Sequence, residues 1–212
     1  MITIHHLGVS QSDRIVWLME ELGLPYELKW YDRGDDFLAP PEYRALHPAG
    51  TAPIITDGDL VLAESTAIVE YISRKHGEGR LSVDVDSPDY PHYLFWMQFN
   101  NNLQCALFIK AAVRATGAEP GPGNLMLTTT QRREDGLYNA LEQRLGESEY
   151  LGGAAFSCAD IMSMFNLTSL GMLGGREIND SLPNTRAYVA RIAARPAYQK
   201  AMAIAGPGAS RP

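Results

Sequence analysis

Glu64 and Ser65 are two neighbouring side chains that together could hold a charged ligand. They end the stretch GTAPIITDGDLVLAES, and Ser65 is a good N-cap for a helix predicted over residues 66–74. The start of a helix offers unpaired backbone N–H groups and the positive end of its dipole, which suit a carboxylate. The carboxylate of Glu64 suits an ammonium group. The pair therefore matches the zwitterionic head of an amino acid, although N-cap serines and solvated glutamates also occur without ligands.

The residues before this pair form a compact scaffold. Ala52-Pro53 is an X-Pro pair, in which a cis peptide bond is possible. Residues 54–56 and 60–62 have the pattern of two short strands, joined across Asp57-Gly58, a dipeptide typical of tight hairpins. We therefore expect a strand hairpin that leads directly into the helix behind Ser65.

The elements before the hairpin complete an α/β domain. Ile2 and Ile4 alternate with polar residues as in a strand, a helix is expected to begin near Ser12, and residues 26–30 read as a second, parallel strand. With a short helix at 42–46, the order is β-α-β-α-β-β-α, the thioredoxin-like arrangement. The turn at residues 9–12, VSQS, lacks the Cys-x-x-Cys pair of a disulfide oxidoreductase. The protein's own thiols are therefore not expected to do redox chemistry.

The second half of the chain is predicted to be all helical. Its helices are expected at 89–116, around Leu137, Leu141 and Leu145, and at 182–195 and 196–203, with a Gly/Pro-rich loop at 117–123. Ser157 and Asp160 have the spacing of a capping box. We predict a first domain over residues 1–76, a linker at 77–88, a helical domain over 89–204 and a flexible tail at 205–212.

Composition excludes several classes of partner. The net charge of -7 argues against a surface for nucleic acid or for an anionic membrane, and no apolar run is long enough to span a bilayer. Cytoplasmic localisation is the resulting expectation. Cys105 and Cys158 are far apart, and neither they nor His5 and His6 have metal-ligand spacing, so we expect no metal and two reduced, partly buried thiols.

Several motifs in order along the chain resemble one family. They are SQSDRIVW at 10–17, EELGLPY at 20–26, HPAGTAP at 47–53, ESTAI at 64–68, the capping box at 156–161, and the ending at 191–196 with Tyr198. Over nearly its whole length the chain resembles a cytosolic glutathione S-transferase, of the bacterial, serine-type, theta- or nu-like kind. The resemblance implies an α/β thioredoxin-like N-terminal domain followed by an all-α helical C-terminal domain.

The resemblance also implies a site for glutathione as cosubstrate. Glu64 and Ser65 would hold its γ-glutamyl end, Ala52 would pair main chain to main chain with its cysteinyl unit, and Pro53 would be cis. The hydroxyl of Ser10 would donate a hydrogen bond to the glutathione sulfur.

Two further positions near the ligand leave alternatives open. Ser12 is well placed to cap the first helix. Ser12 and the backbone N–H groups are the alternatives to Ser10 for activating the thiol. Thr51 stands where many relatives carry a lysine, so one charge contact to the glycyl carboxylate is missing. Glutathione binding is expected to involve Ser10, Ser12, Thr51, Ala52, Pro53, Glu64 and Ser65.

The activity implied is attack of the glutathione thiolate on small hydrophobic electrophiles, as in detoxification, in a homodimer. The electrophile pocket is expected between the domains, lined by Val9 and the region 100–107. Peroxide reduction and dehalogenation are alternatives at the same site. A glutathione-binding scaffold that lost turnover is the alternative of a different class, and Thr51 is the residue that leaves room for it.

Overall fold

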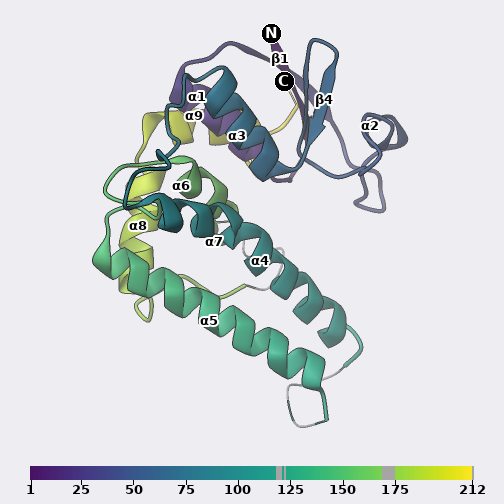
Figure 1. Ribbon diagram of the computed structural model, residues 1–212. Helices are drawn as coiled ribbons and strands as arrows, with labels where there is room; N and C mark the ends of the chain where they lie inside the picture. The colour runs from purple at the N-terminus through teal and green to yellow at the C-terminus, as the bar shows by residue number, and fades with distance from the viewer. Residues whose placement is uncertain (118–120, 122, 169–174, 212) are drawn as a thin grey trace. The chain divides into compact units, whose positions relative to one another are not determined.

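The chain folds into two compact units, which Figure 1 shows as a mixed α/β part and a helical part. The computed structural model describes residues 1–117, 121, 123–168 and 175–211. One unit contains residues 1–83 and 192–212, and the other contains residues 84–191. Part of the predicted loop at 117–123 lies outside the described residues. Over the described ranges, no helix has both the length and the apolar character that crossing a membrane requires.

The first unit is built on a four-stranded sheet of order β2-β1-β3-β4. Its strands are β1 (Ile2–Leu7), β2 (Tyr26–Tyr31), β3 (Ile54–Asp57) and β4 (Leu60–Ala63). The β1 and β2 strands are parallel, whereas β3 is antiparallel to both β1 and β4. The predicted βαβαββα order and the parallel first pair are confirmed.

The hairpin turn lies one residue further along than the sequence indicated. Asp57 pairs with Leu60, so the two turn residues are Gly58 and Asp59, and Asp57 still belongs to β3. Gly58 has φ 59°, the left-handed conformation that a two-residue hairpin requires at its first position and that glycine adopts without steric cost.

The two faces of the sheet carry different side chains because strand residues alternate. Leu7, Tyr31 and Ile54 form one buried cluster with Tyr43 of the short helix α2 (Pro41–Arg44). On β1, Ile2, Ile4 and His6 are all buried and alternate with this set, so they belong to the opposite face. His6 is therefore an inward-facing polar side chain.

Three helices complete the first unit: α1 (Asp13–Leu22), α3 (Ser65–Lys75) and α9 (Pro196–Ala205). The ring centroids of Trp17 on α1 and Tyr198 on α9 are 4.9 Å apart. Arg195, at the N-cap of α9, donates hydrogen bonds of 2.7 and 2.8 Å to the carboxylate of Glu21. The last helix, α9, thus packs on the first, α1. The domain limits of 1–76 and 89–204 inferred from the sequence stay a prediction.

The second unit is helical, as expected. Its helices are α4 (Tyr90–Arg114), α5 (Leu125–Glu147), α6 (Cys158–Ser163), α7 (Phe165–Thr168) and α8 (Pro183–Ala193). Figure 1 shows the two long helices α4 and α5 side by side. Their contact includes a buried ion pair between Lys110 and Glu134. Both halves of the predicted capping box at Ser157 and Asp160 are formed, so this prediction is confirmed.

Candidate functional site

The three segments that the sequence analysis singled out lie at the same end of the sheet. His5 pairs with Ile54, and Ile54 pairs with Ala63. The chain runs out of β1 toward Ser10, enters β3 from Ala52-Pro53, and leaves β4 at Glu64-Ser65. Because β1 and β4 are both antiparallel to β3, these three segments meet at one end of the sheet. The sheet register, which no single motif reveals, therefore brings the predicted residues together.

Ser10 lies in the turn between β1 and α1 and is almost buried, with 8% of its surface exposed. Its hydroxyl donates a 2.7 Å hydrogen bond to the carbonyl of Leu7. It also lies 2.8 Å from the hydroxyl of Ser12, whose backbone N–H donates to Ser10 Oγ over 3.3 Å. Ser10 is thus fixed on three sides, with its small exposed surface left for a ligand.

Ser12 occupies the N-cap position of α1, but its side chain does not cap the helix. Its hydroxyl lies 2.8 Å from Nδ1 of His6 and 2.8 Å from Ser10 Oγ, and the residue has no exposed surface. The prediction that this hydroxyl caps the helix was wrong. The reason is tertiary, because the inward-facing His6 supplies a competing partner.

His6 is the site residue whose role the sequence did not indicate. Its ring is fully buried beside Trp30, with ring centroids 4.3 Å apart, and its Nε2 has no hydrogen-bond partner. Burial lowers the pKa of His6 to about 4, so the imidazole is neutral at physiological pH. The two-residue alternation of β1 was a usable signal, since it places His6 on the face of Ile2 and Ile4.

Arg33 also contributes to the site, and no motif pointed to it. Its guanidinium donates hydrogen bonds to the carbonyls of Gly8, Val9 and Phe37, at 2.8, 3.0 and 2.7 Å. Val9 has φ 51°, a left-handed conformation that costs a β-branched residue on the order of 1–2 kcal/mol. Arg33 thereby holds a strained backbone immediately before Ser10.

The start of α3 differs by one residue from the prediction. Glu64 is the N-cap, with φ 72°, and its carbonyl accepts the 2.9 Å bond from the N–H of Ile68. Ser65 is consequently the first residue of the helix and not its cap. Ser65 is buried, whereas Glu64 is exposed to solvent.

The segment before β3 is arranged as the sequence indicated. The peptide bond between Ala52 and Pro53 is cis. The ladder pairs of β3 begin at Ile54, which leaves the backbone of Ala52 outside the sheet pairing. Thr51 is exposed, Ala52 is half-buried and Pro53 is buried.

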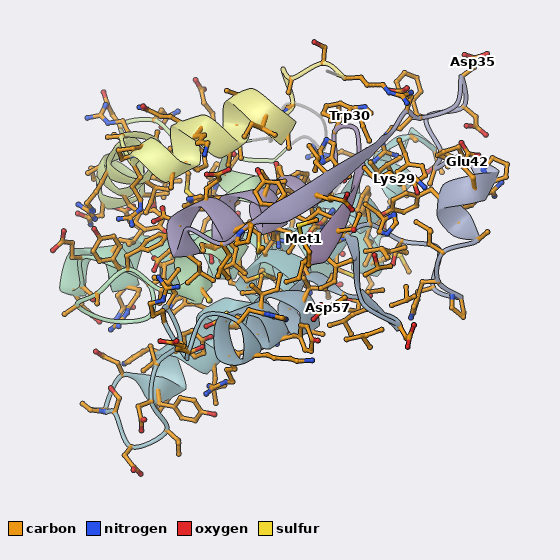
Figure 2. All side chains as sticks on the ribbon, turned by 90° about the horizontal axis from the view of Figure 1, so that it is seen from above. Met1, Lys29, Trp30, Asp35, Glu42 and Asp57 are labelled. Carbon is orange, nitrogen blue, oxygen red and sulfur yellow. The ribbon has the colours of Figure 1, made fainter. Side chains whose placement is uncertain are left out.

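A hollow of about 360 Å³ lies against the edge strand β2 of the same unit. Figure 2 labels three residues of its lining, Lys29 and Trp30 on β2 and Glu42 on α2. Asp32 and Arg211 also line it and form an ion pair of 3.1 Å, and Tyr31 and Leu46 complete the lining. Four of the seven lining residues are therefore charged, two of each sign. Such a lining does not suit an apolar electrophile.

The predicted electrophile region 100–107 divides between two faces of α4. Asn100, Leu103 and Leu107 have no exposed surface. The opposite face, with Asn101 and Cys105, lines a hollow of about 600 Å³ between α4 and α5. Only part of the expected region therefore lines this hollow, and the electrophile pocket expected between the domains stays a prediction.

The two cysteines are free and differ in exposure. Cys158 is buried and Cys105 is exposed, so the expectation of partial burial was wrong for Cys105. Cys105 lies two residues beyond Leu103 on α4 and so faces away from the buried side of that helix. Among the side chains that the structure describes, no three of His, Cys, Asp or Glu gather as a metal site would require.

The fold and the site residues at this end of the sheet define a class of protein. It has a thioredoxin-like unit with serines in place of redox cysteines, joined to a helical unit. Comparison with known proteins narrows the class. The domain family "Glutathione S-transferase, N-terminal domain" matches residues 10–75, and "Glutathione S-transferase, C-terminal domain" matches residues 105–196.

Solved structures and curated relatives agree with these matches. A glutathione S-transferase from Actinobacillus pleuropneumoniae is 32% identical, with a TM-score of 0.83, over 97% of this chain and 93% of that one. A theta class glutathione S-transferase from Xanthomonas axonopodis pv. citri, solved with glutathione bound, is 26% identical, with a TM-score of 0.67, over 97% and 98% of the two chains. Glutathione S-transferase 3 of Schizosaccharomyces pombe is 45% identical over 100 residues, 47% of this chain and 41% of that protein. The chain therefore belongs to the glutathione S-transferase family, which makes it a glutathione transferase.

Proposed function

We propose that the protein binds glutathione at the end of the sheet where Ser10, Ala52-Pro53 and Glu64-Ser65 lie, and that it activates the glutathione thiol for attack on an electrophile. The observation that carries the proposal is the register of the sheet, which brings these three segments to one end. A relative of the same fold from Xanthomonas axonopodis was solved with glutathione bound, which supports this choice of ligand.

The amino-acid end of glutathione is assigned to the start of α3. The exposed carboxylate of Glu64 pairs with the ammonium group. The hydroxyl of Ser65 and the first N–H groups of α3 hold the carboxylate, where the helix dipole favours negative charge. Glu64 keeps a left-handed backbone with φ 72°, a strained conformation of a kind that clusters at ligand sites.

The middle and far end of the ligand are assigned to the segment before β3. The backbone of Ala52, free of the sheet ladder, pairs with the cysteinyl unit, and Pro53 shapes that approach. Thr51 is exposed beside it and offers a hydroxyl to the glycyl carboxylate. A hydroxyl gives a weaker bond to a carboxylate than a charged group does, so we expect a moderate affinity.

Ser10 is the proposed activating residue. It keeps some exposed surface, whereas Ser12 has none, so Ser10 is the serine of this turn that a ligand sulfur reaches. A free thiol has a pKa of about 8.5 and is mostly protonated at neutral pH. Each unit of lowering takes about 1.4 kcal/mol, which is within the range of one hydrogen bond to a charged group.

The thiolate then attacks an electrophilic carbon of a small hydrophobic substrate. The sulfur forms the new bond with its lone pair, and the leaving group departs with the electrons of the bond that breaks.

We further propose that the protein is cytoplasmic and forms a homodimer. The exposed apolar side chains of Leu94, Phe95, Phe108 and Ile109 on α4 support the dimer. A monomeric mass in solution would contradict the dimer.

Calorimetric titration with glutathione tests the binding site. Ser65→Ala is expected to weaken binding about tenfold, since it removes one hydrogen bond to a charged group. Ser73→Ala is the matched control. Ser73 is also a buried serine of α3, but it lies in the last turn of the helix, where its hydroxyl forms hydrogen bonds with the carbonyl of Arg80 and the hydroxyl of Ser82. Equal affinities of the two variants would remove Ser65 from the site.

Steady-state rates with aryl halides, epoxides and hydroperoxides test the chemistry. Conjugation of an aryl halide that falls at least about tenfold in Ser10→Ala, with glutathione affinity retained, is the expected result. The runner-up is a glutathione-binding scaffold, for which Thr51 leaves room. Measurable binding without turnover of any substrate would establish the scaffold and refute the enzyme assignment.

A further inference from the structure

The hydrogen bonds around Ser10 have a direction that follows from counting protons. Each serine hydroxyl carries a single hydrogen. Ser10 donates its hydrogen to the carbonyl of Leu7, which can only accept. The 2.8 Å contact between the two hydroxyls must therefore be donated by Ser12. Ser12 has then no hydrogen left for His6, so Nδ1 of His6 carries the proton and donates it to Ser12 over 2.8 Å.

The resulting chain runs from His6 through Ser12 to Ser10 and ends on Leu7. It also fixes the tautomer of His6, whose Nε2 is then the unprotonated nitrogen beside Trp30. Ser10 Oγ receives a second donor, the backbone N–H of Ser12 at 3.3 Å. A hydroxyl oxygen has two lone pairs, and both are occupied here. Ser10 is left with its own hydrogen as the one group that it offers to a ligand.

We propose that His6 and Ser12 are positioning residues that make Ser10 an obligate hydrogen-bond donor, so that the site accepts the thiolate of glutathione in preference to the thiol. A thiolate sulfur is an acceptor and takes the hydrogen of Ser10. A neutral thiol offers its own hydrogen but finds no lone pair on Ser10 Oγ. This inference rests on the proposed role of Ser10.

Binding requires the hydroxyl hydrogen of Ser10 to turn from Leu7 to the sulfur. The Leu7 carbonyl loses this bond in that state, because the single hydrogen of Ser12, whose Oγ lies 3.5 Å from that carbonyl, is donated to Ser10 Oγ. The thiol proton passes to bulk water, since Nδ1 of His6 already holds a proton and the ring is buried. Ser10 and Ser12 each keep one hydrogen, and the chain of donors stays neutral throughout.

Charged residues adjacent to this turn come from two segments. Asp13 and Arg14, both buried, begin α1, and Arg33 binds the carbonyls of Gly8 and Val9. All three are unchanged in Ser12→Ala, which removes one hydroxyl. A shift in the pKa of bound thiol in that variant therefore reports the loss of the donor from Ser12.

The test measures the pKa of the bound thiol, from the ultraviolet absorbance of the thiolate and from the pH profile of kcat/KM with an aryl halide. Ser12→Ala is expected to raise that pKa by about one unit, a tenfold loss of thiolate at a given pH below it. Binding of S-methylglutathione, which has no thiol proton, is expected to stay unchanged. A wild-type pH profile in Ser12→Ala would overturn the proposal.

Two variants of His6 separate its N–H from its bulk. His6→Asn keeps an N–H donor near the position of Nδ1 and is expected to keep the wild-type profile, whereas His6→Leu is expected to match Ser12→Ala. Equal shifts in both His6 variants would remove His6 from the chain. Ser10→Ala distinguishes the two levels of the argument. If it leaves turnover intact, the proposed function fails; if it abolishes turnover while Ser12→Ala changes nothing, only the role of Ser12 and His6 fails.

Discussion

Replacing Asp160 by asparagine is expected to destabilise the helical unit severely. Asp160 has no exposed surface, and each of its carboxylate oxygens accepts two hydrogen bonds. One oxygen takes the N–H of Leu151 and the hydroxyl of Tyr188, both at 2.9 Å. The other takes the N–H and the hydroxyl of Ser157, at 2.9 and 3.1 Å. Whichever way the asparagine amide is turned, its NH₂ group faces two former donors.

The magnitude follows from those two buried donors. An unsatisfied buried donor costs about 1–3 kcal/mol, so two of them cost roughly 4 kcal/mol. An opposing contribution comes from burial, which raises the pKa of the Asp160 carboxyl because the charged form is poorly solvated there. The neutral amide recovers part of that cost, and we expect a net loss of about 3 kcal/mol in the free energy of unfolding.

Glu142 provides a matched control in the same unit. Its carboxylate accepts bonds of 2.8 to 2.9 Å from the N–H groups of Asn184 and Thr185 and from the hydroxyl of Thr185, at the start of α8. It is half-exposed, so water replaces a lost acceptor. Glu142→Gln is therefore expected to cost about 1 kcal/mol or less.

Urea unfolding followed by circular dichroism measures both variants, and amide exchange at Leu151 and Ser157 supplies the local readout. Exchange at both amides is expected to accelerate in Asp160→Asn and to stay unchanged in Glu142→Gln. Equal losses of stability in the two variants would refute the reasoning, since they would show that burial of the acceptor does not decide the cost.

Three further predictions concern the first unit. Burial raises the pKa of Asp13 to about 7, so the stability that the protonated carboxyl contributes is lost as pH rises toward that value. In urea unfolding, the stability of Asp13→Asn relative to wild type should therefore increase by roughly 3 kcal/mol from pH 5 to 8, and a decrease would contradict this reasoning. Arg33→Met removes the donors that hold strained Val9, and conjugation rates should fall about tenfold with an unchanged dichroism spectrum. The hydrogen bond from Tyr71 lowers the pKa of Asp57, so Asp57→Asn should cost under about 1 kcal/mol at pH 7 in urea unfolding. The difference should shrink below the ordinary pKa and vanish below the lowered pKa of Asp57.

The sequence determined the element order, because hydrophobic period, turn residues and caps are local properties. The alternation in β1, the capping box at Ser157 and Asp160, and the X-Pro pair before β3 were all readable from a few neighbouring residues. Each was found where the sequence placed it. The errors at Asp57-Gly58 and at Ser65 are of one residue, which is the usual limit when a boundary is set by backbone conformation.

The tertiary structure alone decided which side chains meet. His6 and Ser12 are six residues apart, and their contact depends on how α1 packs behind β1. Arg33 lies more than twenty residues beyond Gly8 and Val9, and the parallel pairing of β1 with β2 brings it back to them. Local patterns specify conformation, whereas a hydrogen-bond partner distant in sequence is specified by the sheet register and by burial, which involve the whole unit.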